Sequence, residues 1–233
     1  MPTCAEGCPI SFVVTGVGRS GTGYTAKLLT ELGFPCSHEG IFFPAGEVSR
    51  EKLLRGEPGP WGDASWMAPP AYGNLPDGVV VLHQVRNPVA VIRSHVGIQF
   101  FQKPNAYTEF AIAFTSTLRW HDYAIVKCMK FWVEWNRLAE TAARMPRFRY
   151  HRYRLEDLCD TGKGTLAYVA TLLDRAPTLA DIERALAAVP RNYNSRERDR
   201  GVSWKTVPAL PAKDAVLELA LEYGYTAEEV EKA

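Results

Sequence analysis

Two short apolar runs stand out along the chain, and both are bounded by residues that end regular structure. Residues 10–16 read Ile-Ser-Phe-Val-Val-Thr-Gly, and residues 79–85 read Val-Val-Val-Leu-His-Gln-Val. Runs of this length that are rich in β-branched side chains are typical of strands buried on both faces of a parallel sheet. We expect a third strand near residues 148–153 and another that begins near Phe34.

Helical spacing of apolar side chains follows each run. After the first run it covers residues 24–32, and Gly33 is suited to close that helix. After the second run, Asn87 is suited to cap a helix that Pro88 begins and that continues to Val96. The other expected helices cover residues 120–143, 165–173, 178–188 and 212–223.

Strands that alternate with helices predict an α/β fold of three layers, in which a parallel sheet is flanked by helices on both faces. The 233 residues are interpreted as a single domain. Two stretches do not fit the pattern, namely the Pro- and Gly-rich residues 43–78 and the Arg-rich residues 190–207. Long irregular segments inside a domain are usually functional lids or mobile loops.

The composition excludes several classes of protein. Hydrophobic residues make up 46% and charged residues 23%, which is the balance of a globular protein and not of a disordered chain, a collagen or a coiled coil. With 27 basic and 26 acidic residues, the net charge of +1 provides no long-range field for nucleic acid or an anionic membrane. A bound anion must therefore be held by a local site.

The cysteines and the apolar content predict a cytoplasmic protein. No stretch approaches the roughly 20 apolar residues of a membrane span, and the first residues do not resemble a secretory signal. The five cysteines are scattered and odd in number, so we expect reduced thiols without a disulfide framework. Cys4 and Cys8 have no second Cys/His pair, and no metal site is expected.

A glycine-rich loop joins the first expected strand to the helix that follows it. Residues 16–23 read Gly-Val-Gly-Arg-Ser-Gly-Thr-Gly, and such a loop can turn successive N–H groups toward an anion at a helix N-terminus. The loop resembles a P-loop of NTPases, but Thr22 stands at the lysine position and Gly23 at the position of the magnesium ligand. Arg19 is the candidate replacement cation. A tight turn whose glycines only permit close packing is the alternative.

Residues 17–22, Val-Gly-Arg-Ser-Gly-Thr, resemble the 5′-phosphosulfate loop of sulfotransferases, which use 3′-phosphoadenosine 5′-phosphosulfate (PAPS). The resemblance implies that the loop binds this co-substrate through a run of consecutive residues: Gly18, Arg19, Ser20, Gly21, Thr22, Gly23 and Tyr24. Two positions depart from the family pattern, because Gly18 replaces a usual proline and Gly23 a usual threonine.

A second element strengthens the resemblance. In the family, an arginine at a strand end and a serine eight residues later bind the 3′-phosphate, and Arg86 and Ser94 match this spacing. Arg86 follows an expected strand, and open α/β sheets bind ligands at the carboxyl ends of their strands. An arginine that pairs with a carboxylate is the alternative.

Two further segments resemble the family more weakly. Residues 154–158, Arg-Leu-Glu-Asp-Leu, match a segment after a central strand, but Leu155 replaces the tyrosine that helps to hold adenine in cytosolic members. Residues 200–205 are similar to the stretch that closes over the nucleotide, which makes Arg198 and Arg200 candidates for the 3′-phosphate. A solvated basic loop is equally compatible with this sequence.

Sulfuryl transfer needs a base for the acceptor proton. Some branches of the family carry a catalytic glutamate at a place that matches Glu39, which is the first candidate, and His38 is the second. A solvated turn carboxylate is the alternative. His83 is expected to be a core histidine. Four aromatic residues are interpreted either as walls of an acceptor pocket or as core, namely Trp61, Trp66, Phe100 and Phe101.

The sequence therefore predicts a PAPS-dependent, metal-independent sulfotransferase that acts on a hydroxyl or amine of a small-molecule, carbohydrate or lipid acceptor. A nucleotide-dependent kinase is the enzymatic alternative, although residues 22 and 23 disfavour it. A non-catalytic nucleotide-binding module is the other alternative, and it is favoured by Gly18, Gly23 and Leu155.

Overall fold

The structure is a computed structural model that describes residues 8–55, 60–160, 164–190 and 201–232. In this part of the chain, five strands form one sheet in the order β2-β3-β1-β4-β5, and every neighbouring pair is parallel. The strands are β1 (Phe12–Thr15), β2 (Cys36–His38), β3 (Gly62–Ala64), β4 (Val80–Val85) and β5 (Arg149–Arg154). The parallel α/β sheet predicted from the sequence is confirmed.

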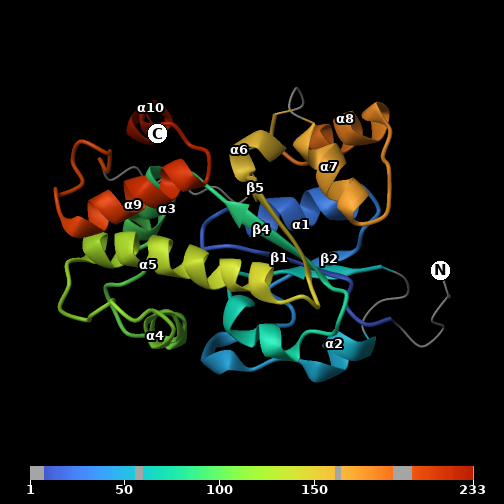
Figure 1. Cartoon of the computed structure of the whole chain (residues 1–233), viewed down its shortest axis with the longest axis horizontal. Coiled ribbons are helices and arrows are strands. Elements are labelled where there is room, and N and C mark those ends of the chain that lie inside the picture. Colours follow the sequence, from blue (N-terminus) through green and yellow to red (C-terminus); the bar gives the residue numbers. More distant parts are fainter. Residues whose placement is uncertain (1–7, 56–59, 161–163, 191–200, 233) are drawn as a thin grey trace.

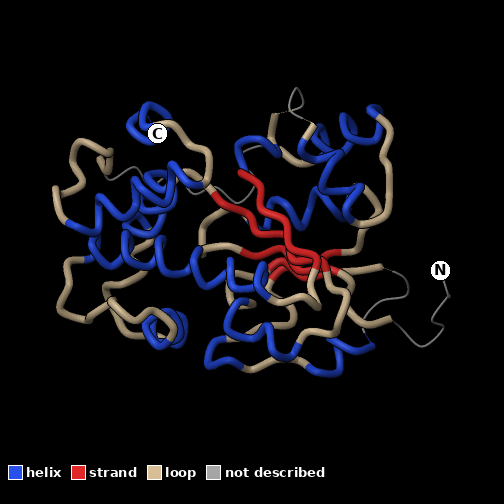
Figure 2. The backbone as a smooth tube through the Cα atoms, in the orientation of Figure 1, coloured by secondary structure: helices blue, strands red, loops and turns tan. Residues whose placement is uncertain are grey.

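Helices pack on both faces of the sheet, which is the central layer in Figure 2. The helices and 3₁₀ segments are α1 (Thr22–Glu31), η1 (Pro44–Gly46), α2 (Arg50–Arg55), η2 (Pro69–Asn74), α3 (Pro88–Gly97), α4 (Ala106–Ala113), α5 (Ala124–Ala139), η3 (Glu140–Arg144), α6 (Leu155–Leu158), α7 (Thr165–Leu172), α8 (Leu179–Ala188), α9 (Pro211–Glu222) and α10 (Ala227–Lys232). Figure 1 shows α1, α7 and α8 on one side of the sheet and α2, α4 and α5 on the other.

Each face of the sheet has its own apolar core, because successive strand side chains point to opposite faces. Phe12 and Val14 belong to the core under α1, α7 and α8, whereas Val13 belongs to the core that α3, α5 and α9 cover. β1 and β4 are buried throughout, as their mostly apolar runs predict.

Three differences from the expected elements have local causes. Part of the stretch 43–78 is regular, because it contributes α2 as well as β3, which lies between β1 and β2. The prediction of an irregular insertion was wrong for these residues. Helix α4 was not predicted, although Asn105 and Thr108 form a capping box at its start. Helix α5 begins at Ala124 instead of residue 120, since Asp122 accepts a hydrogen bond from the backbone N–H of Arg119 and holds a turn there (3.1 Å).

The parallel arrangement brings the carboxyl ends of the strands to one edge of the sheet. The glycine-rich loop follows β1, Glu39 follows β2, and Arg86 follows β4. In a sheet of this kind, that edge is where ligands bind. The predicted site residues of three separate segments therefore meet at the same edge.

Candidate active site

The glycine-rich loop packs closely against its neighbours. A Cβ atom at Gly16 would lie 2.1 Å from the carbonyl oxygen of Gln84, and one at Gly21 would lie 2.7 Å from Leu155 Cδ2. Gly21 also has a φ of +94°, which side-chain-bearing residues rarely adopt. Close packing thus requires both glycines, so the phosphate-binding interpretation rests on other features of the loop.

One such feature is the set of N–H groups at the start of α1. Gly21 is the N-cap and provides no side-chain cap, so the first-turn amides of Thr22 and Gly23 point along the helix axis without a partner in the described part of the chain. Free amides and the positive end of the helix dipole attract an anion. The loop itself is held by Gln84, whose Nε2 donates to the Ser20 carbonyl oxygen (2.7 Å).

Arg19 joins the loop to the second predicted motif. Its Nε donates to Ser94 Oγ at 2.8 Å, and Nη1 of Arg86 donates to the Arg19 carbonyl oxygen at 3.1 Å. Arg19, Arg86 and Ser94 therefore form one cluster, although Ser94 is 75 residues from Arg19. The Arg19 side chain reaches toward the Arg86/Ser94 pair, and its backbone has a φ of +69°.

Two other predicted residues of the loop, Ser20 and Tyr24, have buried side chains. The hydroxyl of Ser20 is fully buried, and its Oγ lies beside Gly16. Tyr24 is 5% exposed and belongs to the apolar core under α1. For Ser20, the backbone is thus the part of the residue available to a ligand at this edge.

The predicted base candidates lie next to the start of α1. A Cβ at Gly23 would be 3.2 Å from the His38 ring, and His38 Nε2 lies 3.4 Å from Thr22 Oγ1. Glu39 Oε1 is 3.8 Å from the same nitrogen of His38. Glu39 has a φ of +54°, an unusual conformation for glutamate, and its backbone N–H donates to the Ala64 carbonyl oxygen (3.0 Å).

Asp63 of β3 holds the turn that carries these two candidates, and the sequence analysis missed it. Its Oδ1 accepts hydrogen bonds from Ser37 Oγ at 2.6 Å and from the Gly40 N–H at 3.0 Å. Burial raises the pKa of the Asp63 carboxyl, although these hydrogen bonds counteract the effect. Asp63 lies inside the stretch that the sequence analysis interpreted as irregular. The one signal for it in the sequence is an acidic residue among neighbours that are buried.

His95 and Trp66 explain one departure from the sulfotransferase loop pattern. A Cβ at Gly18 would lie 3.3 Å from His95 Nε2 and 3.6 Å from Trp66 Cδ2, so these rings leave little space for a proline there. His95 Nδ1 is 3.2 Å from the Val91 carbonyl oxygen, and burial together with Arg19 lowers the pKa of His95 to about 3. The histidine is therefore neutral next to the loop.

Most of the other candidates from the sequence belong to the core. His83 is buried between Tyr150 Oη (2.7 Å) and Asn136 Oδ1 (3.0 Å), as expected for a core histidine, and burial lowers its pKa to about 4. The aromatic residues Trp61, Trp66 and Phe101 are also buried, which supports the core alternative for these three. Phe100 is partly buried and packs against Trp66.

Val202, which belongs to the Arg-rich stretch 190–207, lies next to α3. Nε of Arg93 donates to the Val202 carbonyl oxygen at 2.8 Å, which places residue 202 beside the helix that carries Ser94. Arg198 and Arg200 lie outside the described residues. Their predicted contact with the 3′-phosphate remains a prediction.

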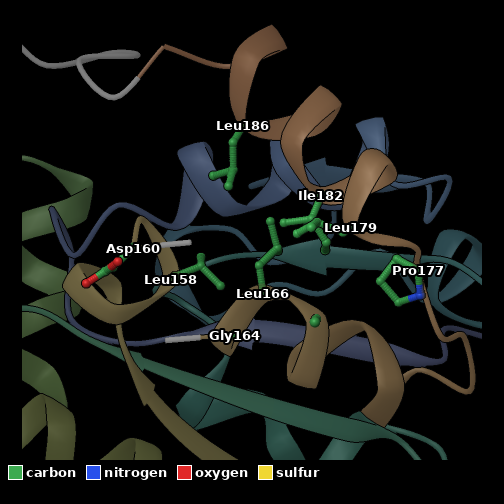
Figure 3. A pocket seen from close by; sticks show the side chains of 9 residues that line it. Leu158, Asp160, Gly164, Leu166, Pro177, Leu179, Ile182 and Leu186 are labelled. Carbon is green, nitrogen blue, oxygen red and sulfur yellow. The ribbon is translucent and has the colours of Figure 1, made fainter. Parts of the chain in front are cut away.

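A cavity of about 190 Å³ lies elsewhere, among α6, α7 and α8. Figure 3 shows that mainly leucine and isoleucine side chains surround it, with Leu158, Leu166 and Ile182 among them. No residue of the glycine-rich loop, the Arg86/Ser94 pair or the 37–40 turn lines this cavity. It is therefore separate from the candidate active site.

Metal-binding clusters and membrane-spanning helices are both absent from the residues that the structure describes. No group of three or more His, Cys, Asp or Glu side chains is arranged there to hold a metal ion. None of the helices in that part combines the length and the apolar character of a membrane span.

The fold is that of sulfotransferase domains. The structure is similar to the sulfotransferase domain from the curacin biosynthetic pathway, with a TM-score of 0.60 and 15% sequence identity over 94% of this chain and 99% of that one. It is also similar to the sulfotransferase domain of the Synechococcus PCC 7002 olefin synthase, with a TM-score of 0.59 and 14% identity over 97% and 98% of the two chains. Comparison of the sequence with protein-family models and with curated proteins finds no match.

Proposed function

We propose that this protein is a sulfotransferase that moves a sulfuryl group from PAPS to a hydroxyl or amine of a small-molecule, carbohydrate or lipid acceptor. The main support is the Arg19–Ser94 hydrogen bond of 2.8 Å, together with the contact between Arg86 and the Arg19 carbonyl. These contacts put the loop suited to a 5′-phosphosulfate directly beside the pair suited to a 3′-phosphate. PAPS carries both groups on one ribose, so a site for it needs two adjoining anion subsites.

The loop has the chemistry to receive the negative charge that develops in the reaction. During transfer, the bond between sulfur and the bridging oxygen breaks, and its electron pair stays on the 5′-phosphate of adenosine 3′,5′-bisphosphate. The amides of Thr22 and Gly23, the Thr22 hydroxyl and the guanidinium of Arg19 would stabilise that charge. Position 22 is a threonine and not a lysine, so the positive side chain of the loop 16–23 is that of Arg19.

Glu39 is the proposed general base. It would take the proton from the acceptor hydroxyl or amine while the acceptor oxygen or nitrogen forms its new bond to sulfur. Its position after β2, beside His38 and the start of α1, supports this role. His38, which lies 3.4 Å from Thr22 Oγ1, is the second candidate for the same step.

Arg86 and Ser94 would select a nucleotide with a 3′-phosphate over ATP. The test is to titrate the wild-type chain and Arg86→Ala with adenosine 3′,5′-bisphosphate and with adenosine 5′-phosphate by calorimetry. A charge-assisted hydrogen bond contributes about 1.5–3 kcal/mol, so Arg86→Ala should weaken bisphosphate binding at least about tenfold more than monophosphate binding.

The control for this test is Arg184→Ala, which removes an exposed arginine on α8 far along the chain from these motifs. It should leave both affinities unchanged. An equal loss of both nucleotides in Arg86→Ala would place Arg86 away from the 3′-phosphate and remove the main support for PAPS. A wild-type chain that prefers ATP with magnesium would instead favour the kinase alternative.

A further inference from the structure

The junction between β4 and α3 is held on several sides. The carbonyl oxygen of Arg86 accepts a hydrogen bond from Trp132 Nε1 at 3.3 Å, and the N–H of Asn87 donates to Glu156 Oε1 at 2.9 Å. The Asn87 side chain donates to the Glu229 carbonyl oxygen at 2.8 Å while its Oδ1 caps α3. Helices α5, α6 and α10 thus fix the backbone next to the proposed 3′-phosphate residue.

Tyr225 completes this support from a distant part of the sequence. Its hydroxyl donates to Glu156 Oε2 at 2.7 Å, so the Glu156 carboxylate uses one oxygen for Asn87 and the other for Tyr225. Tyr225 is only 3% exposed, and the guanidinium of Arg154 lies 4.4 Å from the centre of its ring.

Arg154 also fastens the segment on either side of Tyr225. It donates to the Gly224 carbonyl oxygen at 2.7 Å and pairs with Glu229 at 2.9 Å. The segment 224–229 is therefore held against β5 and α6, and it has little freedom to move away from Glu156. Neither Glu156 nor Tyr225 contacts the Arg19/Ser94 cluster directly among the hydrogen bonds of the described residues.

We propose that Glu156 and Tyr225 are positioning residues for the 3′-phosphate subsite, because they hold Asn87 and thereby aim the neighbouring Arg86. This inference rests on the proposed function. The Arg86 side chain is half-buried and makes a single described hydrogen bond, to the Arg19 carbonyl, so its direction depends on the backbone from which it extends. A charge-assisted contact to phosphate is sensitive to such a change in direction.

The test measures how much a 3′-phosphate improves binding to the full chain. The quantity is the ratio of the Kd for adenosine 5′-phosphate to the Kd for adenosine 3′,5′-bisphosphate. Tyr225→Phe removes one hydroxyl and keeps the ring beside Arg154. It should lower this ratio about three- to tenfold, which is less than the loss expected for Arg86→Ala because Tyr225 acts only through the backbone next to Arg86. Tyr168→Phe, at an exposed tyrosine on α7, is the matched control and should leave the ratio unchanged.

Substitution of Glu156 provides a second, graded test. Glu156→Ala removes both contacts and should lower the ratio more than Tyr225→Phe does. Glu156→Gln keeps an oxygen that can accept a hydrogen bond from the Asn87 N–H, so its ratio should be closer to that of wild type than to that of Glu156→Ala. If Glu156→Ala fails to fold, Tyr225→Phe decides the question alone.

One result would overturn the inference while leaving the proposed function intact, namely a high wild-type ratio that Tyr225→Phe does not change. An equal loss of affinity for both nucleotides is one form of this result, and it is expected of a purely structural contact. A wild-type chain that does not distinguish the two nucleotides would overturn the proposed function itself, and this inference with it.

Discussion

Asp63 offers the sharpest test of how the fold holds the proposed base. The substitution is Asp63→Ala, which leaves the backbone of β3 in place and removes the acceptor of two hydrogen bonds. These bonds come from Ser37 Oγ (2.6 Å) and the Gly40 N–H (3.0 Å), on either side of His38 and Glu39. Without them, backbone contacts alone hold the turn to β3: the pairing of β2 with β3 and the hydrogen bond from the Glu39 N–H to the Ala64 carbonyl oxygen.

The expected loss of stability follows from these contacts. Two hydrogen bonds to a carboxylate, at about 1.5–3 kcal/mol each, contribute about 3–6 kcal/mol. Alanine also removes the cost of burying a carboxylate, so the net decrease in the free energy of unfolding should be about 2–4 kcal/mol. Asp63→Asn keeps an acceptor oxygen, and it should lose at least about 1 kcal/mol less than alanine does.

The effect on catalysis should be separable from the effect on binding. A displacement of about 1 Å in a positioned group can lower turnover about 100-fold. We therefore expect Asp63→Ala to lower sulfate transfer by about 10- to 100-fold under conditions where the variant stays folded. The Kd for adenosine 3′,5′-bisphosphate should change little, because the nucleotide motifs lie on β1, β4 and α3.

The raised pKa of Asp63 adds a dependence of stability on pH. The native state keeps this proton to a higher pH than the unfolded chain, whose aspartate pKa is about 3.9. At pH values between the unfolded and the native pKa of Asp63, the native state binds more protons than the unfolded chain. The contribution of Asp63 to stability therefore falls as pH rises and increases on acidification. The measured quantity is the difference in the free energy of unfolding between wild type and Asp63→Asn, because this difference isolates the contribution of Asp63.

Urea unfolding, followed by tryptophan fluorescence at several pH values between about 4 and 7, measures this difference in the free energy of unfolding. Turnover is measured by the transfer of labelled sulfate. The control is Asp77→Asn, at an aspartate whose side chain is 82% exposed. If Asp63→Ala matches this control in both stability and turnover, Asp63 does not hold the turn. If wild type instead becomes relatively more stable than Asp63→Asn as pH rises, the assigned direction of the pKa shift is wrong.

Two further predictions concern the base and the loop. Glu39→Gln should lower transfer of labelled sulfate from PAPS to a panel of phenols, sugars and lipids by about 10²–10⁴-fold in the presence of EDTA, with nucleotide affinity unchanged. Full activity of Glu39→Gln together with an inactive His38→Ala would move the base to His38, and tight bisphosphate binding without any labelled acceptor would favour the non-catalytic alternative. Arg19→Ala and Arg19→Gly should lose turnover alike, because both remove the guanidinium. The glycine variant should nevertheless be about 0.5–1 kcal/mol more stable than the alanine variant. The reason is that a φ of +69° costs residues other than glycine about 1–2 kcal/mol, of which glycine regains only part. Equal stability of the two in urea unfolding would show that the loop backbone carries no such strain.

The sequence by itself determined the parts of the fold that local chemistry encodes. β1 and β4 stand in mostly apolar runs, and the start of α3 follows from the cap at Asn87, whose side chain accepts from the Val89 N–H. The glycine-rich loop is placed by the strand before it and the helix after it. For these elements, the sequence contains both the hydrophobic pattern and the residues that begin or end the element.

The tertiary structure decided which of these parts meet. β3 has only three residues and no alternating pattern, and it is a strand because β1 and β2 supply hydrogen-bonding partners on both sides. Asp63 reaches the Glu39 turn only through that pairing. Likewise, residues 224–229 lie next to the start of α3 because Glu156 and Arg154 connect segments about 70 residues apart. Contacts of this kind depend on how the helices pack around the sheet, and the local sequence patterns do not predict that packing.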